Sequence, residues 1–311
     1  MIYFIYGQDS HRVKGKVEEI ILGYKKVHES GLNLIYIDAV EKSFGDLCNN
    51  LKITSMFAEK KLIIVKNVFE NLKFQEAFVE NIKNLEDSKD IIVISEPTAP
   101  DQRTKFFKAL LKNVKCQEFE FLQPAMLRKW IIQEFEKNNI KVNMDALDLM
   151  ISRVGGDLWQ MVNEVKKLSN FKLGGIVDKK DVELLVGSNI ENDIFKTIDA
   201  LVSKDKKLAL SLLHKHLDDG EAPLKLLAMI SYQFRNLLVI RELQDMGLPY
   251  AAAVKKSGLH PFVAQKIFYI ANQFSMLKLK KIYQKIFQVD SDIKTGKVEP
   301  ETALDLLLAS I

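Results

Sequence analysis

Cysteine is almost missing from this sequence, and its scarcity excludes one kind of site. The 311 residues include two cysteines, Cys48 and Cys116, which lie far apart and form no Cys-x-x-Cys pair or Cys/His cluster. Structural zinc sites need closely grouped Cys and His ligands. The sequence therefore predicts no metal site, and a reducing compartment is expected.

Long apolar runs and a strong excess of one charge are also missing. No stretch approaches the ~18 apolar residues that cross a bilayer, and the apolar start at residues 1–7 lacks the basic segment and cleavage pattern of a signal peptide. We therefore expect a soluble, cytoplasmic protein. The 45 basic residues barely exceed the 41 acidic ones, for a net charge of +4. This balance permits contact with nucleic acid but does not argue for it, because dedicated DNA-binding domains are far more basic.

A nucleotide-binding signature is missing as well. A P-loop reads GxxxxGK[ST] after a first strand, because its backbone N–H groups wrap the phosphates and its Lys reaches them. Gly15 and Lys16 echo this pattern, but they lie too far from Gly7, and Val17 stands where a hydroxyl would hold magnesium. Gly15 also falls within a helical apolar stripe, and Glu96 alone follows a later strand where paired acids are needed. We therefore predict no cofactor and no nucleotide binding.

What is present is ordinary globular material, 47% hydrophobic and 28% charged, and its length predicts two or three domains. The first 120 or so residues alternate short apolar runs with helical stripes, which indicates a parallel sheet covered by helices. The predicted strands span residues 2–6, 34–37, 62–65, 91–95 and 117–121, with helical patterns at 13–24, 44–51, 74–85 and 106–114.

The remainder of the chain has only helical patterns. Pro124 starts a series of four short helices, because Pro is favoured in the first turn of a helix. From Asn189 onward longer helices follow, with a junction at Gly220 and Pro223. The predicted fold is therefore an α/β parallel-sheet domain at residues 1–122, a small helical domain at 123–187 and a larger helical domain at 188–311.

Two adjacent apolar residues, Met56 and Phe57, form the first candidate site. They follow the helical stripe at 44–51 and precede the charged residues 59–61, which mark nearby solvent. Such a pair fits an exposed plug for a partner's pocket. It also fits an arrangement in which one side chain packs inward and the other covers the sheet edge.

A second candidate site is the helix face shared by Lys278, Lys281 and Lys285. These lysines fit contact with DNA phosphates, although most basic helix faces are merely solvated. No Ser/His/Asp or Cys/His arrangement stands out, and His214 and His216, two residues apart, do not face each other on a helix. The sequence therefore predicts no catalytic residues.

In their order and spacing, several segments make the chain resemble the delta subunits of bacterial DNA polymerase III, the clamp-opening subunits of the clamp loader. They are residues 3–9 (YFIYGQD), 55–65 (SMFAEKKLIIV), 155–168 (GGDLWQMVNEVKKL), 193–195 (DIF), 220–229 (GEAPLKLLAM), 234–235 (FR) and 290–297 (DSDIKTGK). The resemblance runs essentially from end to end. It implies an AAA+-like core that does not bind ATP, a helical lid and a C-terminal helical collar for oligomerisation.

The resemblance also implies partners. In this family a hydrophobic pair, typically Leu-Phe, inserts into a pocket on the sliding clamp, and Met56 and Phe57 stand at that place here. The implied partners are the clamp (the beta subunit), gamma/tau-type and delta-prime-type subunits held through the collar, and primed DNA within a replisome, with no membrane. The family's template-stacking aromatic has no counterpart near Lys294, Thr295 and Gly296.

The residues alone leave three other functional hypotheses open. One is an ATP-hydrolysing AAA+ subunit, against which the turn after Gly7 argues. Another is a stand-alone DNA-binding helical protein, against which the near-neutral charge argues. The last is a delta-prime-type subunit, whose zinc-module cysteines are missing and whose Ser-Arg-Cys finger is only partly echoed by Ser152, Arg153 and Val154.

Overall fold

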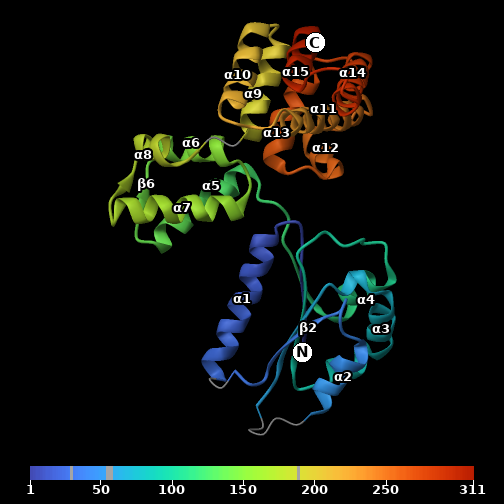
Figure 1. Ribbon diagram of the computed structural model, residues 1–311. Coiled ribbons are helices and arrows are strands. Elements are labelled where there is room, and N and C mark those ends of the chain that lie inside the picture. The colour runs from blue at the N-terminus through green and yellow to red at the C-terminus, as the bar shows by residue number, and fades with distance from the viewer. Residues whose placement is uncertain (29–30, 54–58, 188–189) are drawn as a thin grey trace. The chain divides into compact units, whose positions relative to one another are not determined.

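The computed structural model describes the chain except for residues 29–30, 54–58 and 188–189. It divides into two compact units, residues 1–121 (unit 1) and 122–311 (unit 2) (Figure 1). Among the described residues, no helix is both long and apolar enough to cross a membrane.

Unit 1 is built on a five-stranded sheet in the order β2-β3-β4-β1-β5, in which every neighbouring pair is parallel. The strands are β1 (Ile2–Tyr6), β2 (Leu34–Asp38), β3 (Leu62–Lys66), β4 (Ile91–Glu96) and β5 (Lys115–Glu118). The central strands β3 and β4 are almost entirely buried. Their continuous apolar runs follow from this position, because a parallel sheet is covered on both faces.

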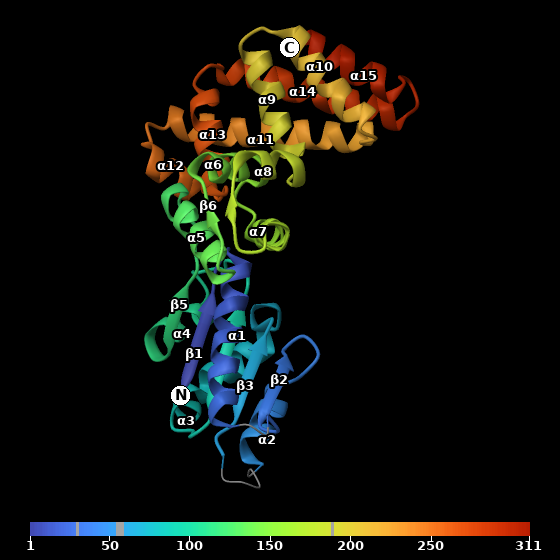
Figure 2. The same ribbon diagram turned by 90° about the vertical axis from the view of Figure 1, so that its left-hand side faces the viewer.

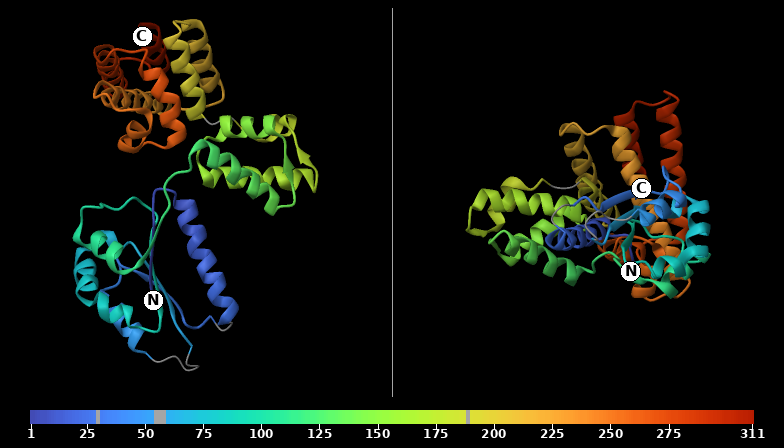
Figure 3. Two further views of the ribbon diagram at one scale, coloured as in Figure 1. Left: turned by 180° about the vertical axis from the view of Figure 1, so that it is seen from behind. Right: turned by 90° about the horizontal axis from the view of Figure 1, so that it is seen from below.

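Helices cover both faces of this sheet. Helix α1 (Ser10–Val27) lies on one face, toward which Figure 2 looks, and packs Val13 and Val17 against alternate strand residues such as Ile5 and Ile64. The opposite face carries α2 (Phe44–Lys52), a 3-10 turn η1 (Val68–Glu70), α3 (Leu72–Glu86) and α4 (Lys105–Asn113). The view from behind in Figure 3 shows the same two sides.

Unit 2 begins with four helices and a small strand pair around one hydrophobic core. The elements are α5 (Pro124–Lys137), β6 (Lys141–Val142), α6 (Met144–Val154), α7 (Leu158–Lys172), β7 (Ile176–Val177) and α8 (Lys179–Leu185). The four helices confirm the prediction. The strands β6 and β7, which pair in parallel, were not predicted because two residues are too few to show an alternating pattern.

The remainder of unit 2 is helical and encloses a second core, to which long helix α11 contributes Leu226, Ile230 and Phe234. The helices are α9 (Ile190–Val202), α10 (Lys206–Asp218), α11 (Pro223–Asp245), α12 (Tyr250–Ser257), α13 (Pro261–Ala271), α14 (Met276–Lys294) and α15 (Pro300–Ser310). Helix α12 was not predicted, because its run of three alanines carries no strong apolar stripe.

The predicted fold class, a parallel-sheet α/β domain followed by helical structure, is confirmed. The finer division at 123–187 and 188–311 stays a prediction, which the two separate cores of unit 2 support. Strand β5 spans 115–118 rather than the predicted 117–121. The residues of β5 are exposed and mostly polar, so they lack the apolar pattern by which the other strands were predicted. The nearby apolar residues Phe119 and Phe121 follow β5, which shifted the predicted range toward them.

Candidate functional site

The first candidate site is the junction between α2 and β3. Residues 54–58, and with them Met56 and Phe57, lie outside the described residues, so their assignment stays a prediction. Both flanks of the junction are described. Helix α2 starts with a capping box in which Ser43 and Asp46 satisfy each other's backbone N–H groups. Ile53, just beyond its last residue, is 62% exposed.

Lys61 ties the start of β3 to the end of α2. Its side chain is only 4% exposed, and its ammonium donates to the carbonyl oxygens of Asn50 and Ile53. Carbonyls in the last turn of a helix have no intrahelical partner, and the C-terminal end of the helix dipole favours a cation. The backbone N–H of Lys61 also donates to Asp90 Oδ1 at 2.9 Å.

The two residues before Lys61 are held against the C-terminal part of α1 and the loop after it. The Tyr24 hydroxyl donates to the carbonyl oxygen of Lys60 at 2.7 Å, and Asn33 Nδ2 donates to Glu59 Oε2 at 2.8 Å. The sequence had suggested that residues 59–61 mark solvent. That expectation is correct for exposed Lys60 and wrong for Lys61, whose ammonium reaches the carbonyls of α2. The junction is therefore fixed at both described ends.

The turn between β1 and α1, where a phosphate loop would lie, is short, and its backbone N–H groups donate to carbonyls of neighbouring segments. The backbone N–H of Gly7 donates to the carbonyl oxygens of Glu96 and Thr98, and that of Asp9 donates to Phe119. The Asp9 carboxylate, in a residue only 4% exposed, caps α1 by accepting from the Arg12 N–H at 3.1 Å. An acidic group thus occupies the helix N-terminus that would otherwise attract phosphate. Gly15 lies inside α1, as predicted.

Glu96, the single acid after β4, faces inward. It is 3% exposed, the backbone N–H groups of Val68 and Phe69 in η1 lie near its carboxyl, and its Oε2 has no hydrogen-bond partner among the described residues. Burial raises the pKa of Glu96 to about 7. This carboxyl is therefore buried beside the turn after β3 and is not presented to solvent.

Replacing Glu96 with Gln should change how the stability of unit 1 depends on pH. The folded carboxyl keeps its proton up to about pH 7, whereas an unfolded one loses it near 4.5. The contribution of Glu96 to the free energy of unfolding is therefore largest below the unfolded pKa and falls as pH rises through the folded one, by up to about 3 kcal/mol. Glu96→Gln should remove this fall and make unit 1 more stable above neutral pH.

Urea unfolding at several pH values measures this effect in the intact chain. Both tryptophans, Trp130 and Trp159, belong to unit 2. Their fluorescence therefore follows unit 2, and far-UV circular dichroism follows both units. If unit 1 of the Glu96→Gln variant loses stability with rising pH as steeply as that of the wild type, the pH dependence does not come from Glu96.

The second candidate site lies on α14. Lys278, Lys281 and Lys285 are exposed, as predicted, and share a helix face. Lys278 Nζ lies 5.3 Å from the Phe274 ring centre, and Lys285 Nζ donates to the Ser310 carbonyl oxygen at 3.2 Å. These lysines belong to a wider basic region, because residues 246–289 contain no Asp or Glu and seven lysines: Lys255, Lys256, Lys266, Lys278, Lys280, Lys281 and Lys285. The near-neutral chain therefore has a strongly basic segment.

Arg153 has a structural use. Its guanidinium Nη1 donates to the carbonyl oxygens of Val182 at 2.8 Å and Glu183 at 3.2 Å, and also to that of Val186. These carbonyls lie in and just after the last turn of α8, and that of Val182 also accepts from the Val186 N–H. The partial echo of a Ser-Arg-Cys finger at residues 152–154 therefore holds α6 to α8.

Two family models match the chain. The model described as "DNA polymerase III, delta subunit" matches residues 3–120, and the one described as "DNA polymerase III delta subunit, C-terminal domain" matches residues 191–311. Together they cover about three quarters of the chain.

Proteins similar to this chain carry the same description. The DNA polymerase III subunit delta of Bacillus subtilis (strain 168) is 24% identical over 324 residues, covering 100% of this chain and 92% of that protein. The probable DNA polymerase III subunit delta of Aquifex aeolicus (strain VF5) is 20% identical over 306 residues, covering 93% and 85%. The solved structure of the Bacillus subtilis DNA clamp loader delta protein has a TM-score of 0.77 at 23% identity, covering 99% and 94% of the two chains. At this identity the structural likeness speaks for the fold alone.

Proposed function

Because this chain belongs to the DNA polymerase III delta subunit family, we propose that it is the clamp-loader subunit that binds the sliding clamp and opens it for loading onto primed DNA. Family membership, from two family models and two relatives matched along most of their length, is the observation that carries this proposal. It places the chain in DNA replication as part of a clamp loader.

The α2–β3 junction is the proposed clamp contact, with Met56 and Phe57 as the anchor. Support comes from the residues on either side of the junction. The Lys61 ammonium donates to a carbonyl oxygen at the end of α2, and the Tyr24 hydroxyl donates to the carbonyl oxygen of Lys60. A short segment between two fixed ends loses less conformational entropy on binding than a long loose one. Methionine is flexible and close in size to leucine, so it can fill the place of the Leu that is usual in this family.

Opening follows from a difference in affinity. A clamp is a closed ring, and a subunit that binds the sprung-open form more tightly than the closed form shifts the population toward the open one. Shifting a ratio of 1:99 to 99:1 needs about 5.5 kcal/mol of differential binding. This chain is proposed to do so without catalysis, and ATP would be bound and hydrolysed by other subunits. The short β1–α1 turn with its buried Asp9 carboxylate supports that division of roles.

The helical part of unit 2 is proposed to hold the other subunits, of the gamma/tau and delta-prime types, as a collar. Lys278, Lys281 and Lys285 are proposed to contact the DNA backbone within the assembly, which the acid-free run at 246–289 supports. The protein would then work in the cytoplasm, at the replisome. The closed turn after Gly7 argues against an ATP-hydrolysing subunit. The net charge of only +4 argues against a stand-alone DNA-binding protein.

The opening step can be tested with the chain and its cognate clamp alone. Clamp loaded on nicked circular DNA is incubated with the wild-type chain, without ATP, and clamp release is followed by gel filtration. We expect the chain to speed release at least tenfold, because it favours the open ring. If the chain co-elutes with the clamp and yet leaves release unchanged, it is a clamp-binding protein that does not open the ring.

A further inference from the structure

Positive charge is concentrated before and along α4, on the opposite face of the sheet from α1. Residues 101–115 hold five basic side chains and one acidic one, so this stretch alone carries a charge of +4, equal to that of the whole chain. The basic residues are Arg103, Lys105, Lys108, Lys112 and Lys115. The remaining residues are therefore neutral in sum.

Most of the apolar side of α4 is buried, although Leu111 beside the lysines is 50% exposed. Phe106, Phe107 and Leu110 are buried in the core of unit 1, whereas Lys105, Lys108 and Lys112 are exposed. The lysines recur at i, i+3 and i+7, so they form one row about 10 Å long at 1.5 Å per residue. Measured along the axis of duplex DNA, that length spans about three phosphates of one strand, at 3.4 Å of rise each.

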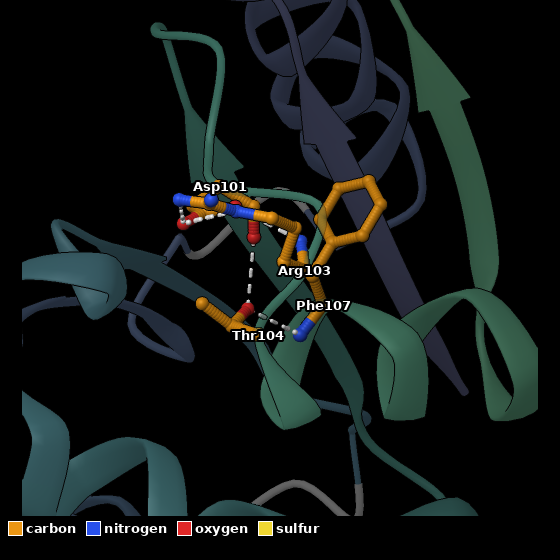
Figure 4. Close-up of polar contacts among 4 residues, drawn as sticks. All are labelled: Asp101, Arg103, Thr104 and Phe107. Carbon is orange, nitrogen blue, oxygen red and sulfur yellow. Dashed lines mark hydrogen bonds and ion pairs between the residues drawn. The ribbon is translucent and has the colours of Figure 1, made fainter.

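Arg103 is held in place at the start of this row (Figure 4). Its side chain is 91% exposed, yet Nε donates to Asp101 Oδ1 at 3.0 Å and Nη2 donates to Asp101 Oδ2 at 2.8 Å. The carbonyl oxygen of Asp101 accepts from Thr104 Oγ1 at 2.9 Å, and Thr104 in turn caps α4 by accepting from the Phe107 N–H. The one acid of the stretch thus fixes the guanidinium at the end of the lysine row.

Several cations of α1 are paired, unlike those of this row. Arg12 pairs with Asp9, Lys14 with Glu18 and Lys16 with Glu19. The side-chain ammonium groups of Lys105, Lys108 and Lys112 have no ion pair or hydrogen bond within the part of the chain that the structure describes. These ammonium groups are therefore open to an external anion.

We propose that this surface, made of Arg103, Lys105, Lys108 and Lys112 and here called the α4 basic face, binds the phosphate backbone of nucleic acid. Lysine and arginine side chains contact phosphates without an apolar anchor, whereas protein interfaces favour aromatic anchors and are poor in lysine. The proposal goes beyond the proposed function, which assigns clamp binding to the α2–β3 junction and DNA contact to α14.

The test compares two triple variants of the full chain that change the net charge equally. Lys105→Gln/Lys108→Gln/Lys112→Gln removes the row, and Lys73→Gln/Lys83→Gln/Lys89→Gln removes three exposed lysines elsewhere in unit 1. Fluorescence anisotropy with a labelled primed DNA is measured over a series of salt concentrations. The row variant should bind at least tenfold more weakly, and the slope of log K against log salt should fall by about 2–3, at 0.7–0.9 per phosphate contact. Equal losses in both variants would overturn the proposal.

Lysine acetylation footprinting locates the contact without any substitution. Primed DNA should protect Lys105, Lys108 and Lys112 at least threefold more than Lys73 and Lys83, and equal protection would contradict the assignment. A polyglutamate peptide that binds as tightly as the DNA and protects the same lysines would also overturn it, in favour of an acidic protein partner. Clamp binding by the row variant should stay at the wild-type level, which separates this proposal from the proposed function.

Discussion

Replacing Gly7 with alanine is expected to unfold unit 1 and to leave unit 2 folded. A β-carbon at this position would lie 2.2 Å from the carbonyl oxygen of Phe119, and the backbone φ of +141° is one that other residues rarely adopt. Phe119 cannot easily move away, because its N–H donates to the carbonyl oxygen of Tyr6 at 2.8 Å and its carbonyl oxygen accepts from the backbone N–H of Asp9 at 3.1 Å. We expect a loss of about 4 kcal/mol or more, at the upper end for single substitutions. Urea unfolding followed by circular dichroism and by tryptophan fluorescence measures the two units.

Gly15→Ala is the matched control for this variant. Gly15 lies inside α1, and a β-carbon there would meet nothing within 4 Å. Alanine in a helix interior is more favourable than glycine by about 0.5–1 kcal/mol, so this variant should be slightly more stable than the wild type. A Gly7→Ala protein whose unit 1 unfolds at the wild-type urea concentration would show that the β1–α1 turn is not closed as described.

Much of unit 1 was predictable because its strands and helices are determined by residues that are neighbours in sequence. The runs at 62–65 and 91–95 are apolar at almost every position, as strands buried on both faces must be, and they became β3 and β4. Asp9 and Asp157 cap α1 and α7, and each stands directly before its helix, so cap and helix are adjacent in sequence.

The candidate site was less predictable, because its geometry depends on residues distant in sequence. Lys61 looks like part of a solvated triplet, and only the placement of the end of α2 beside β3 shows that its ammonium caps that helix. The fixed guanidinium of Arg103 depends instead on a local turn, which brings Asp101, two residues earlier, alongside it. For Met56 and Phe57 the sequence leaves both an outward and an inward arrangement open, and only binding to the clamp decides between them.

Replacing both Met56 and Phe57 with alanine is expected to weaken binding of the sliding clamp about 100-fold or more. Burying two such side chains in a partner's pocket is worth roughly 3–5 kcal/mol on transfer scales, and each 1.4 kcal/mol corresponds to a factor of about ten in affinity. Because the clamp contact would lie at a junction whose flanks are held by Lys61 and Tyr24, the loss should leave the fold intact. Isothermal titration of the clamp into each protein measures the affinity.

Titration and pull-down of the cognate clamp with the wild type, Met56→Ala/Phe57→Ala and a control variant test the central claim most directly. The control is Leu22→Ala/Leu72→Ala, which truncates two apolar side chains of unit 1 that are 61% and 72% exposed. We predict that the wild type and the control retain the clamp equally and that the Met56→Ala/Phe57→Ala protein loses it while unfolding at the wild-type urea concentration. Equal retention of the clamp by all three proteins would contradict the account, because the clamp would then be gripped elsewhere.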